Sequence, residues 1–201
     1  MFAIFRITII GVVLLSTSVA AAAGVTLAAV AGVHCDKPAV RDGSGFPSAC
    51  APRPMAGGAI GWAAHSRWRV DLEAIFAPRR FTSQAFVSND AVRVDVLETA
   101  VIAGWRLRPA PAGWDLTIRG GPQVGSRLRA RRRFRDVDED ITDQLREADL
   151  KLLVALRMSK RIGGASLLLE GRVGWGLTDL DNTNQQQIRS RAVGMLVGYA
   201  R

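Results

Sequence analysis

Apolar and polar side chains alternate along most of the chain, which is the pattern of β-strands that separate two environments. The clearest case is the segment DLKLLVALRMS, residues 149–159. Apolar residues occupy every second position from Leu150 to Met158 and share one face of an extended strand, whereas Lys151 and Arg157 lie on the other face. Similar alternation recurs in the segments that follow Trp68.

Eight strands can be drawn from this pattern, and the connections between them are alternately long and short. The predicted strands are Val25–Val33, Gly57–Ala64, Trp68–Arg80, Ala91–Leu107, Trp114–Ala130, Ala148–Ser159, Ala165–Thr178 and Ile188–Tyr199. Short turns at one end and long loops at the other are typical of barrels in bacterial outer membranes. We therefore predict an all-β fold, an eight-stranded antiparallel up-and-down transmembrane β-barrel. A secreted soluble sandwich would show a similar alternation.

A short apolar segment precedes the predicted strands. Arg6 is followed by the apolar run Ile7–Leu15 and then by small residues, which is the layout of a secretory signal peptide. The run is shorter than the roughly 20 apolar residues that a membrane-spanning helix needs. We expect a signal peptide over residues 1–22, cleaved near Ala20–Ala22, and a barrel over residues 23–201. The predicted location is the outer membrane of a didermic bacterium.

Charged residues of both signs occupy the polar faces of the predicted strands. An eight-stranded barrel has an interior just wide enough to be filled by side chains. A charge buried there needs a partner, because an unpaired buried charge is strongly destabilising. We therefore expect an interior ion-pair network that closes the barrel to solutes, formed by Arg69, Asp71, Glu73, Glu98, Arg106, Arg119, Arg157, Glu170 and Arg172. A narrow porin-like channel for small solutes is the alternative, and it would need an uncharged gap in this network.

The chain is basic, with 27 Lys and Arg, 18 Asp and Glu, and a formal net charge of +9. The predicted export makes nucleic acid an improbable partner and favours the anionic head groups of membrane lipids. The densest basic stretch is RLRARRRFR, residues 127–135, in which Arg131, Arg132 and Arg133 are candidates for contacts with glycolipid phosphates. The alternative is that these arginines pair with the acidic residues that follow in segment 136–140.

The two cysteines, Cys35 and Cys50, lie in one polar segment and are predicted to form a disulfide in an oxidising compartment. Closing this loop would stabilise the fold by about 3 kcal/mol. His34 adds too few ligands for a closed metal site, so neither a metal nor a cofactor is expected. The adjacent His65 and Ser66 suggest no catalytic triad, because neighbouring strand residues point to opposite faces. The chain is therefore not expected to be an enzyme.

Several segments, taken in order, resemble a known family. They are WRVDLEAIFAPRRF (residues 68–81), VDVLETAVIAGWRL (94–107), IRGGPQVGSRL (118–128), EGRVGWGLTDLD (170–181) and IRSRAVGMLVGYAR (188–201). On these segments the chain resembles the porin-like, PorT-type outer-membrane β-barrel family. The resemblance implies a monomeric barrel inserted by the barrel-assembly machinery, with no shared cofactor or catalytic residue. Chains of this family usually end in an aromatic residue, whereas Tyr199 here is followed by Ala200 and Arg201.

These observations predict a non-enzymatic integral outer-membrane protein, structural or surface-interacting. Side chains fill its interior, and its long outer loops are available for contact with a surface ligand.

Overall fold

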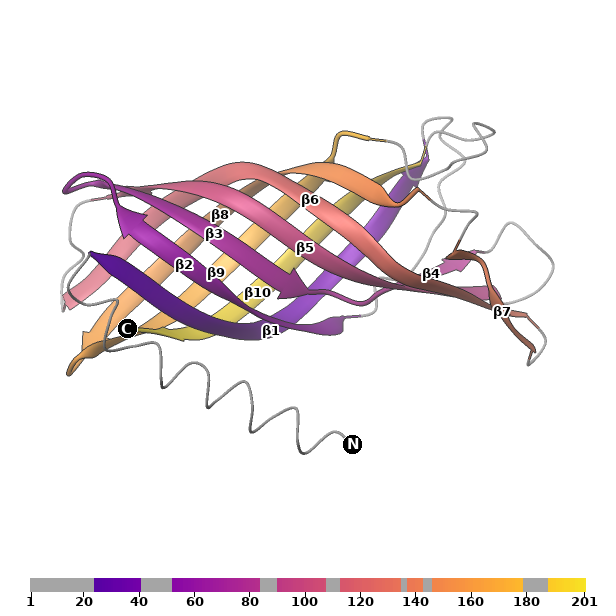
Figure 1. The fold of residues 1–201 in the computed structure, drawn as a ribbon, viewed down its shortest axis with the longest axis horizontal. Helices are drawn as coiled ribbons and strands as arrows, with labels where there is room; N and C mark the ends of the chain where they lie inside the picture. Colours follow the sequence, from indigo (N-terminus) through magenta and orange to yellow (C-terminus); the bar gives the residue numbers. More distant parts are fainter. Residues whose placement is uncertain are drawn as a thin grey trace.

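Eight long strands close into an antiparallel barrel in the computed structural model (Figure 1), which describes residues 24–40, 52–83, 90–107, 113–134, 137–142, 146–178 and 188–201. The barrel strands are β1 (Val25–Val40), β2 (Arg53–Ala63), β3 (Trp68–Phe76), β5 (Asp90–Arg106), β6 (Trp114–Phe134), β8 (Ala148–Ile162), β9 (Ala165–Gly176) and β10 (Ile188–Ala200). Each strand pairs with its neighbours along the chain, and β1 pairs with β10 to close the ring. The predicted eight-stranded barrel is confirmed, whereas the predicted signal peptide lies outside the described residues.

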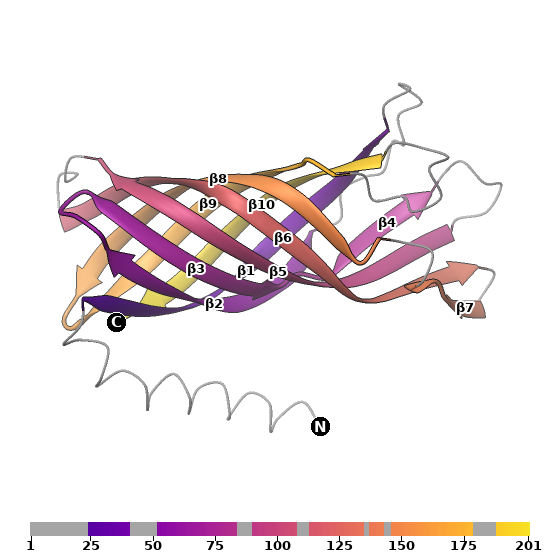
Figure 2. The same ribbon diagram turned by 45° about the horizontal axis from the view of Figure 1, so that its top comes forward.

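Two short strands, β4 (Arg79–Ser83) and β7 (Val137–Asp140), extend the sheet beyond one end of the barrel (Figure 2). The predicted third strand is interrupted at Pro78, which has no N–H to donate to the ladder, and the chain resumes pairing with β5 as β4. The segment expected to be a loop after Ala130 instead continues β6 to Phe134 and returns as β7. We call this end the extension end. The opposite end, with the short turns at 64–67 and 163–164, is the turn end.

The strand register fixes the tilt of the barrel. Cross-strand partners lead from Cys35 through Val193, Val173, Val154, Gly120, Ala103, Val70 and Trp62 back to β1 at Val25, ten residues from the start. A stagger of this size in an eight-stranded barrel corresponds to a strand tilt of about 40°, so each residue adds about 2.5 Å of height. The cross-strand partner therefore lies about one residue closer to the turn end at each step.

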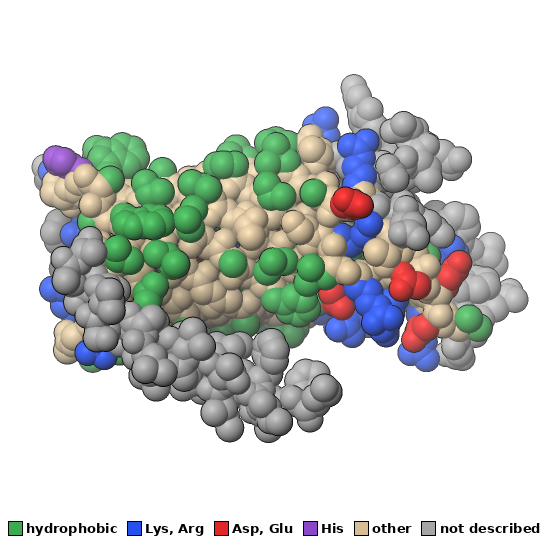
Figure 3. Space-filling model, viewed as in Figure 1, with side chains coloured by type: hydrophobic (Ala, Val, Ile, Leu, Met, Phe, Trp, Pro, Cys, Tyr) green, Lys and Arg blue, Asp and Glu red, His purple; other side chains and the backbone are tan. Residues whose placement is uncertain are grey.

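Apolar side chains cover the outside of the barrel (Figure 3). On β8, Leu152, Val154 and Leu156 point outward with exposed fractions of 45%, 40% and 47%, whereas Leu153 between them is 1% exposed. Equivalent outward residues on the other strands form a belt about 25 Å tall, as in membrane-spanning barrels. Trp68 and Trp105 stack edge to face, with ring centroids 4.6 Å apart, at the edge of this belt near the turn end. No helix among the described residues has the length and apolar character to cross a membrane.

Glycines allow the small barrel to coil tightly. A Cβ on Gly121 would lie 2.0 Å from the carbonyl oxygen of Val101, and one on Gly57 would lie 2.1 Å from that of Ala74. Only glycine permits this close approach of two backbones. In the turn between β8 and β9, Gly163 adopts a positive φ of 61°, which other residues rarely do.

Candidate functional site

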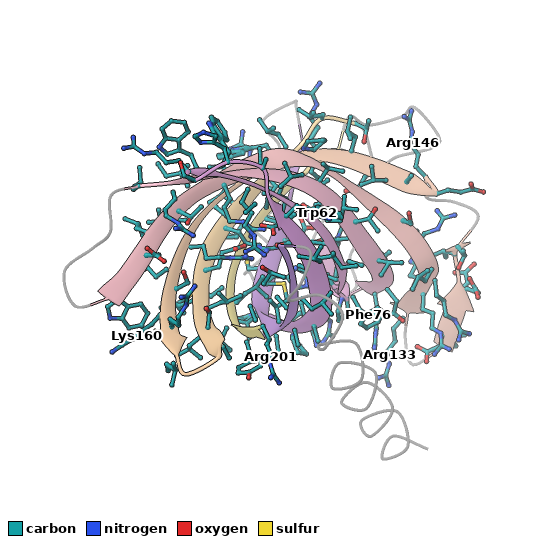
Figure 4. The ribbon with its side chains drawn as sticks, turned by 60° about the vertical axis from the view of Figure 1, so that its left-hand side comes forward. Trp62, Phe76, Arg133, Arg146, Lys160 and Arg201 are labelled. Carbon is teal, nitrogen blue, oxygen red and sulfur yellow. The ribbon has the colours of Figure 1, made fainter. Side chains whose placement is uncertain are left out.

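The interior near the turn end holds a cluster of four arginines and three carboxylates, which we call the turn-end cluster. Its members are Arg69, Asp71, Glu73, Arg119, Arg157, Glu170 and Arg172. They come from β3, β6, β8 and β9, where each occupies an inward position of the alternating pattern. Figure 4 turns this end toward the viewer and shows side chains with nitrogen and oxygen atoms inside the ring of strands.

Glu170 links three of these arginines. It accepts hydrogen bonds from Arg119, from Arg172 at 2.9 Å through Nε, and from Arg157 at 2.7 Å through Nε. Glu73 binds the same three guanidinium groups, that of Arg119 at 2.8 Å, that of Arg157 at 3.2 Å and that of Arg172 at 2.9 Å. Because each carboxylate is shared among several arginines, the cluster is a connected network and not a set of separate pairs.

A second cluster fills the interior near the extension end, and we call it the extension-end cluster. It comprises Asp36, Arg79, Glu98, Gln123, Asp149 and Lys151. Arg79 lies 2.8 Å from Glu98 and 3.1 Å from each of Asp36 and Asp149. Lys151, which is fully buried, lies 3.1 Å from Asp36 and 3.2 Å from Glu98.

Apolar residues separate the two clusters along the strands. On β8, Leu153 and Ala155 lie between Lys151 and Arg157, and all four are buried. The turn-end cluster has four cations and three anions, and the extension-end cluster has two cations and three anions. The twelve charges of the two clusters therefore balance. These packed and paired side chains fill the part of the lumen that the structure describes.

Seven of the nine residues predicted for a single interior network meet in the turn-end cluster. The other two differ from the prediction. Glu98 belongs to the extension-end cluster, and Arg106 points into the mouth at the turn end, where it is exposed and forms no ion pair with another described residue. Arg106 lies at the last residue of β5, beyond the packed part of the lumen, so solvent takes the place of a carboxylate partner.

The sequence prediction missed most of the extension-end cluster. Asp149 and Lys151 share the polar face of the best-patterned strand, so they could have been included. Arg79 required the strand pairing to resume after Pro78, and Asp36 required β1 to continue to Val40 instead of ending at Val33. Neither continuation has a hydrophobic pattern to indicate it.

Arg131, Arg132 and Arg133, the predicted glycolipid contacts, lie on the β6 part of the extension. The register places them opposite Asp140, Glu139 and Asp138, respectively. This pairing of basic and acidic halves favours the alternative interpretation, in which the two halves neutralise each other. The Thr142 hydroxyl and amide both donate to the Asp140 carboxylate, at 2.5 and 3.0 Å, and hold its pKa below the ordinary value.

A different set of cations lies on β1, β4, β5, β6 and β10 where the apolar belt ends. We call it the basic collar, and its members are Lys37, Arg80, Arg93, Arg129, Arg189 and Arg191, all exposed. When the stagger between strands is included, the Cα atoms of these residues span about 8 Å along the barrel axis. Figure 3 shows Lys and Arg side chains gathered along this boundary.

Within the collar, cations face cations. Arg80 lies directly opposite Arg93, and Lys37 lies directly opposite Arg191. The local acids are few: Asp95 lies 3.3 Å from Arg93, and Asp140 lies 3.9 Å from Arg129. Like charges on directly opposite strand positions repel each other, and a bound anion would relieve this repulsion.

Cys35 lies on β1 and is not a free thiol. Its predicted partner Cys50 is outside the described residues, so the pairing remains a prediction. Ser66 Oγ lies 3.1 Å from His65 Nδ1, contrary to the expectation that adjacent side chains diverge, because both residues belong to a turn and not to a strand. No carboxylate of the described residues contacts His65, and no group of three or more metal-ligating side chains occurs among these residues.

Solved outer-membrane barrels share this fold. The outer membrane protein OprG of Pseudomonas aeruginosa is similar with a TM-score of 0.55 and 10% identity, over 89% of this chain and 95% of that one. Neisserial surface protein A (NspA) is similar with a TM-score of 0.52 and 12% identity, over 87% of this chain and 96% of that one. The outer membrane protease OmpT of Escherichia coli aligns with a TM-score of 0.48 and 11% identity, over 88% and 95%.

At these identities the likeness concerns the fold alone. No protein family model and no curated protein matches the sequence. The chain thus has the fold of outer-membrane β-barrels, and its resemblance to the PorT-type family remains a prediction.

Proposed function

We propose that this chain is a non-enzymatic outer-membrane protein that does not conduct solutes and that binds the phosphate groups of outer-leaflet glycolipid through its basic collar. The turn end then faces the periplasm and the extension end faces the outside, as the short turns and the longer strands require. We also propose that the chain is a monomer, exported by its predicted signal peptide and inserted by the barrel-assembly machinery. The belt of exposed apolar side chains between the two ends supports the membrane location.

The observation that carries the proposed ligand is the set of directly opposed cations at the end of the apolar belt. Arg80 opposite Arg93 and Lys37 opposite Arg191 are unfavourable pairs in water. At this height the barrel surface meets the head groups of the lipid, and phosphates there can bridge two cations at once. Guanidinium groups suit this role because they present paired donors to phosphate oxygens. The collar thereby replaces the Arg131–Arg133 stretch, whose charges face Asp138–Asp140, as the principal glycolipid contact.

A collar variant with Lys37→Gln, Arg80→Gln, Arg93→Gln and Arg191→Gln is expected to bind lipopolysaccharide at least about tenfold more weakly than the wild type, since charge-assisted hydrogen bonds to phosphate are lost. Binding is measured with fluorescent lipopolysaccharide in a neutral detergent. The same variant is expected to be as stable as the wild type, or more stable, in neutral detergent without lipopolysaccharide, because the opposed cations are gone.

The matched control removes four exposed arginines from the turn end, with Arg67→Gln, Arg106→Gln, Arg161→Gln and Arg201→Gln. Both variants lose the same net charge, so an effect of overall charge would weaken lipopolysaccharide binding equally in both. Equal weakening, or unchanged binding in the collar variant, would reject the collar as the glycolipid site.

The filled interior supports a barrel that does not conduct, in preference to the narrow channel. Six cations, five of them buried, and six carboxylates occupy the lumen, and apolar residues lie between the two clusters. The wild-type protein in planar lipid bilayers is therefore expected to give no discrete conductance steps. Regular, protein-dependent steps of uniform size would favour the channel.

A further inference from the structure

A cavity of about 690 Å³ opens at the turn end, inside the mouth of the barrel. Its walls come from all eight barrel strands, and its floor is the turn-end cluster, represented by Arg119, Arg157 and Asp71. The ion pairs of the turn-end cluster form the floor, so the cavity ends at this cluster and opens at the turn end. We call it the vestibule. Its volume is in the range of small-molecule sites.

Arginines gather along one wall of the vestibule. The register carries a single inward row from Arg106 on β5 through Thr117 on β6 to Arg157 on β8. Arg67 continues this row on the other side of Arg106, since its carbonyl accepts the Arg106 N–H at 2.8 Å. The next inward row adds Arg69 and Arg119, which are the cross-strand partners of Gly104 on its two sides. The wall therefore presents five arginines over four neighbouring segments.

Some arginines of the vestibule are paired with carboxylates, and others are not. Arg69, Arg119 and Arg157 are bound by carboxylates of the turn-end cluster. The exposed arginines of the vestibule are Arg67, Arg106, Arg161 and Arg201, and none of them forms an ion pair with another described residue. Outside the cluster, the lining contains one acidic side chain, that of Asp115. The vestibule thus has an excess of positive charge that the barrel's own carboxylates leave unmatched.

Hydroxyl groups complete the lining. Thr117, Ser159 and Ser166 lie on inward positions between the arginines and can each donate a hydrogen bond. Arginine forks with adjacent hydroxyl donors are the chemistry that binds phosphate oxygens. Low-dielectric walls around a single sign of charge also concentrate counter-ions from the surrounding solution.

We infer that the vestibule is a binding site for a small, water-soluble, phosphate-bearing anion taken up from the compartment that the turn end faces. The closed ring of strands keeps membrane lipids out of the lumen, and the packed floor prevents passage to the other end. The site therefore binds its ligand without transporting it. This inference is independent of the basic collar, which lies on the outer surface at the opposite end.

The test uses the purified full-length protein in a zwitterionic detergent, with inorganic tripolyphosphate as the probe in isothermal titration calorimetry. The Arg67→Gln/Arg106→Gln variant is expected to bind tripolyphosphate at least about tenfold more weakly than the wild type, because it loses two guanidinium contacts. The matched control is Arg131→Gln/Arg133→Gln, which removes two exposed arginines that lie opposite Asp140 and Asp138 at the extension end, outside both the vestibule and the collar. This control is expected to bind tripolyphosphate with wild-type affinity.

Three results would each overturn the inference: no binding by the wild type, equal affinity in the vestibule variant, or equal weakening in both variants. Identical gel mobility before and after boiling in either variant would show that it had not folded. In that case Arg161→Gln, a single change at an exposed position, takes its place and is expected to weaken binding in the same direction. The vestibule and the collar fail separately, since the Arg67→Gln/Arg106→Gln variant tests the first with tripolyphosphate and the four-residue collar variant tests the second with lipopolysaccharide.

Discussion

Replacing Glu170 with glutamine is expected to destabilise the folded barrel by about 3–5 kcal/mol, the range observed when one partner of a buried ion pair is removed. Glu170 is 1% exposed and accepts hydrogen bonds from Arg119, Arg157 and Arg172. Glutamine keeps the size of the side chain but removes its charge, so three guanidinium groups would depend on Glu73 and Asp71 alone. Urea unfolding in phospholipid vesicles, followed by tryptophan fluorescence, measures the loss.

The control for this substitution is Asp95→Asn, which removes a carboxylate paired with Arg93 at 3.3 Å on the surface. An exposed pair contributes about 0.2–1 kcal/mol, so the control should unfold near the wild-type urea concentration. A compensating variant, Glu170→Gln with Arg157→Met, restores the charge difference of the cluster and should recover a large part of the stability. Equal unfolding of the Glu170 and Asp95 variants would contradict a buried network.

Strand pairing was predictable where one face of a strand meets hydrocarbon and the other meets the ion clusters. Over β8 the alternation is strict, and the structure follows it from Asp149 to Met158 without a break. Long alternating segments predict register as well, because a slip by one residue would move every apolar side chain to the wrong face. The strands from Trp68 onward satisfy this condition best. The predicted bounds of the eight barrel strands are accurate to within three residues except at the end of β1, the start of β2 and the ends of β3 and β6.

The extension could not be predicted in the same way. The sequence of β7, VDED, has no apolar alternation, and its place in the sheet depends on pairing with the basic end of β6. β4 follows a proline and pairs with β5 instead of extending β3. In both cases the neighbouring strand determines the structure, so a pattern confined to the segment itself has little predictive value.

The basic collar and the vestibule depend on the closure of the barrel. Lys37 and Arg191 are far apart in the sequence, and they become neighbours because β1 and β10 close the ring. The common height of the collar further requires the ten-residue stagger, which no single strand reveals. Sequence patterns therefore identified which residues point inward or outward, whereas the grouping of these residues at each end came from the register.

Replacing Val154 with arginine is expected to destabilise the barrel in lipid vesicles by about 2–4 kcal/mol, the range for arginine at the midplane of a membrane barrel. Val154 is the central member of the outward apolar row of β8 and is 40% exposed, so the substitution creates no clash in the interior. The penalty arises entirely from placing a guanidinium group in hydrocarbon. Urea unfolding in vesicles, together with the shift in gel mobility on boiling, measures it.

Ile162→Arg is the matched control, because Ile162 is also an outward apolar residue of β8 but ends the strand at the turn end, about 20 Å from Val154 along the barrel axis. Near the interface the same substitution is expected to destabilise by about 0–1 kcal/mol. In a water-soluble barrel both positions would face solvent, and both arginines would be nearly neutral. A large difference between the two variants therefore requires hydrocarbon around the middle of the barrel and water at its end, and equal small effects would exclude the membrane-spanning arrangement.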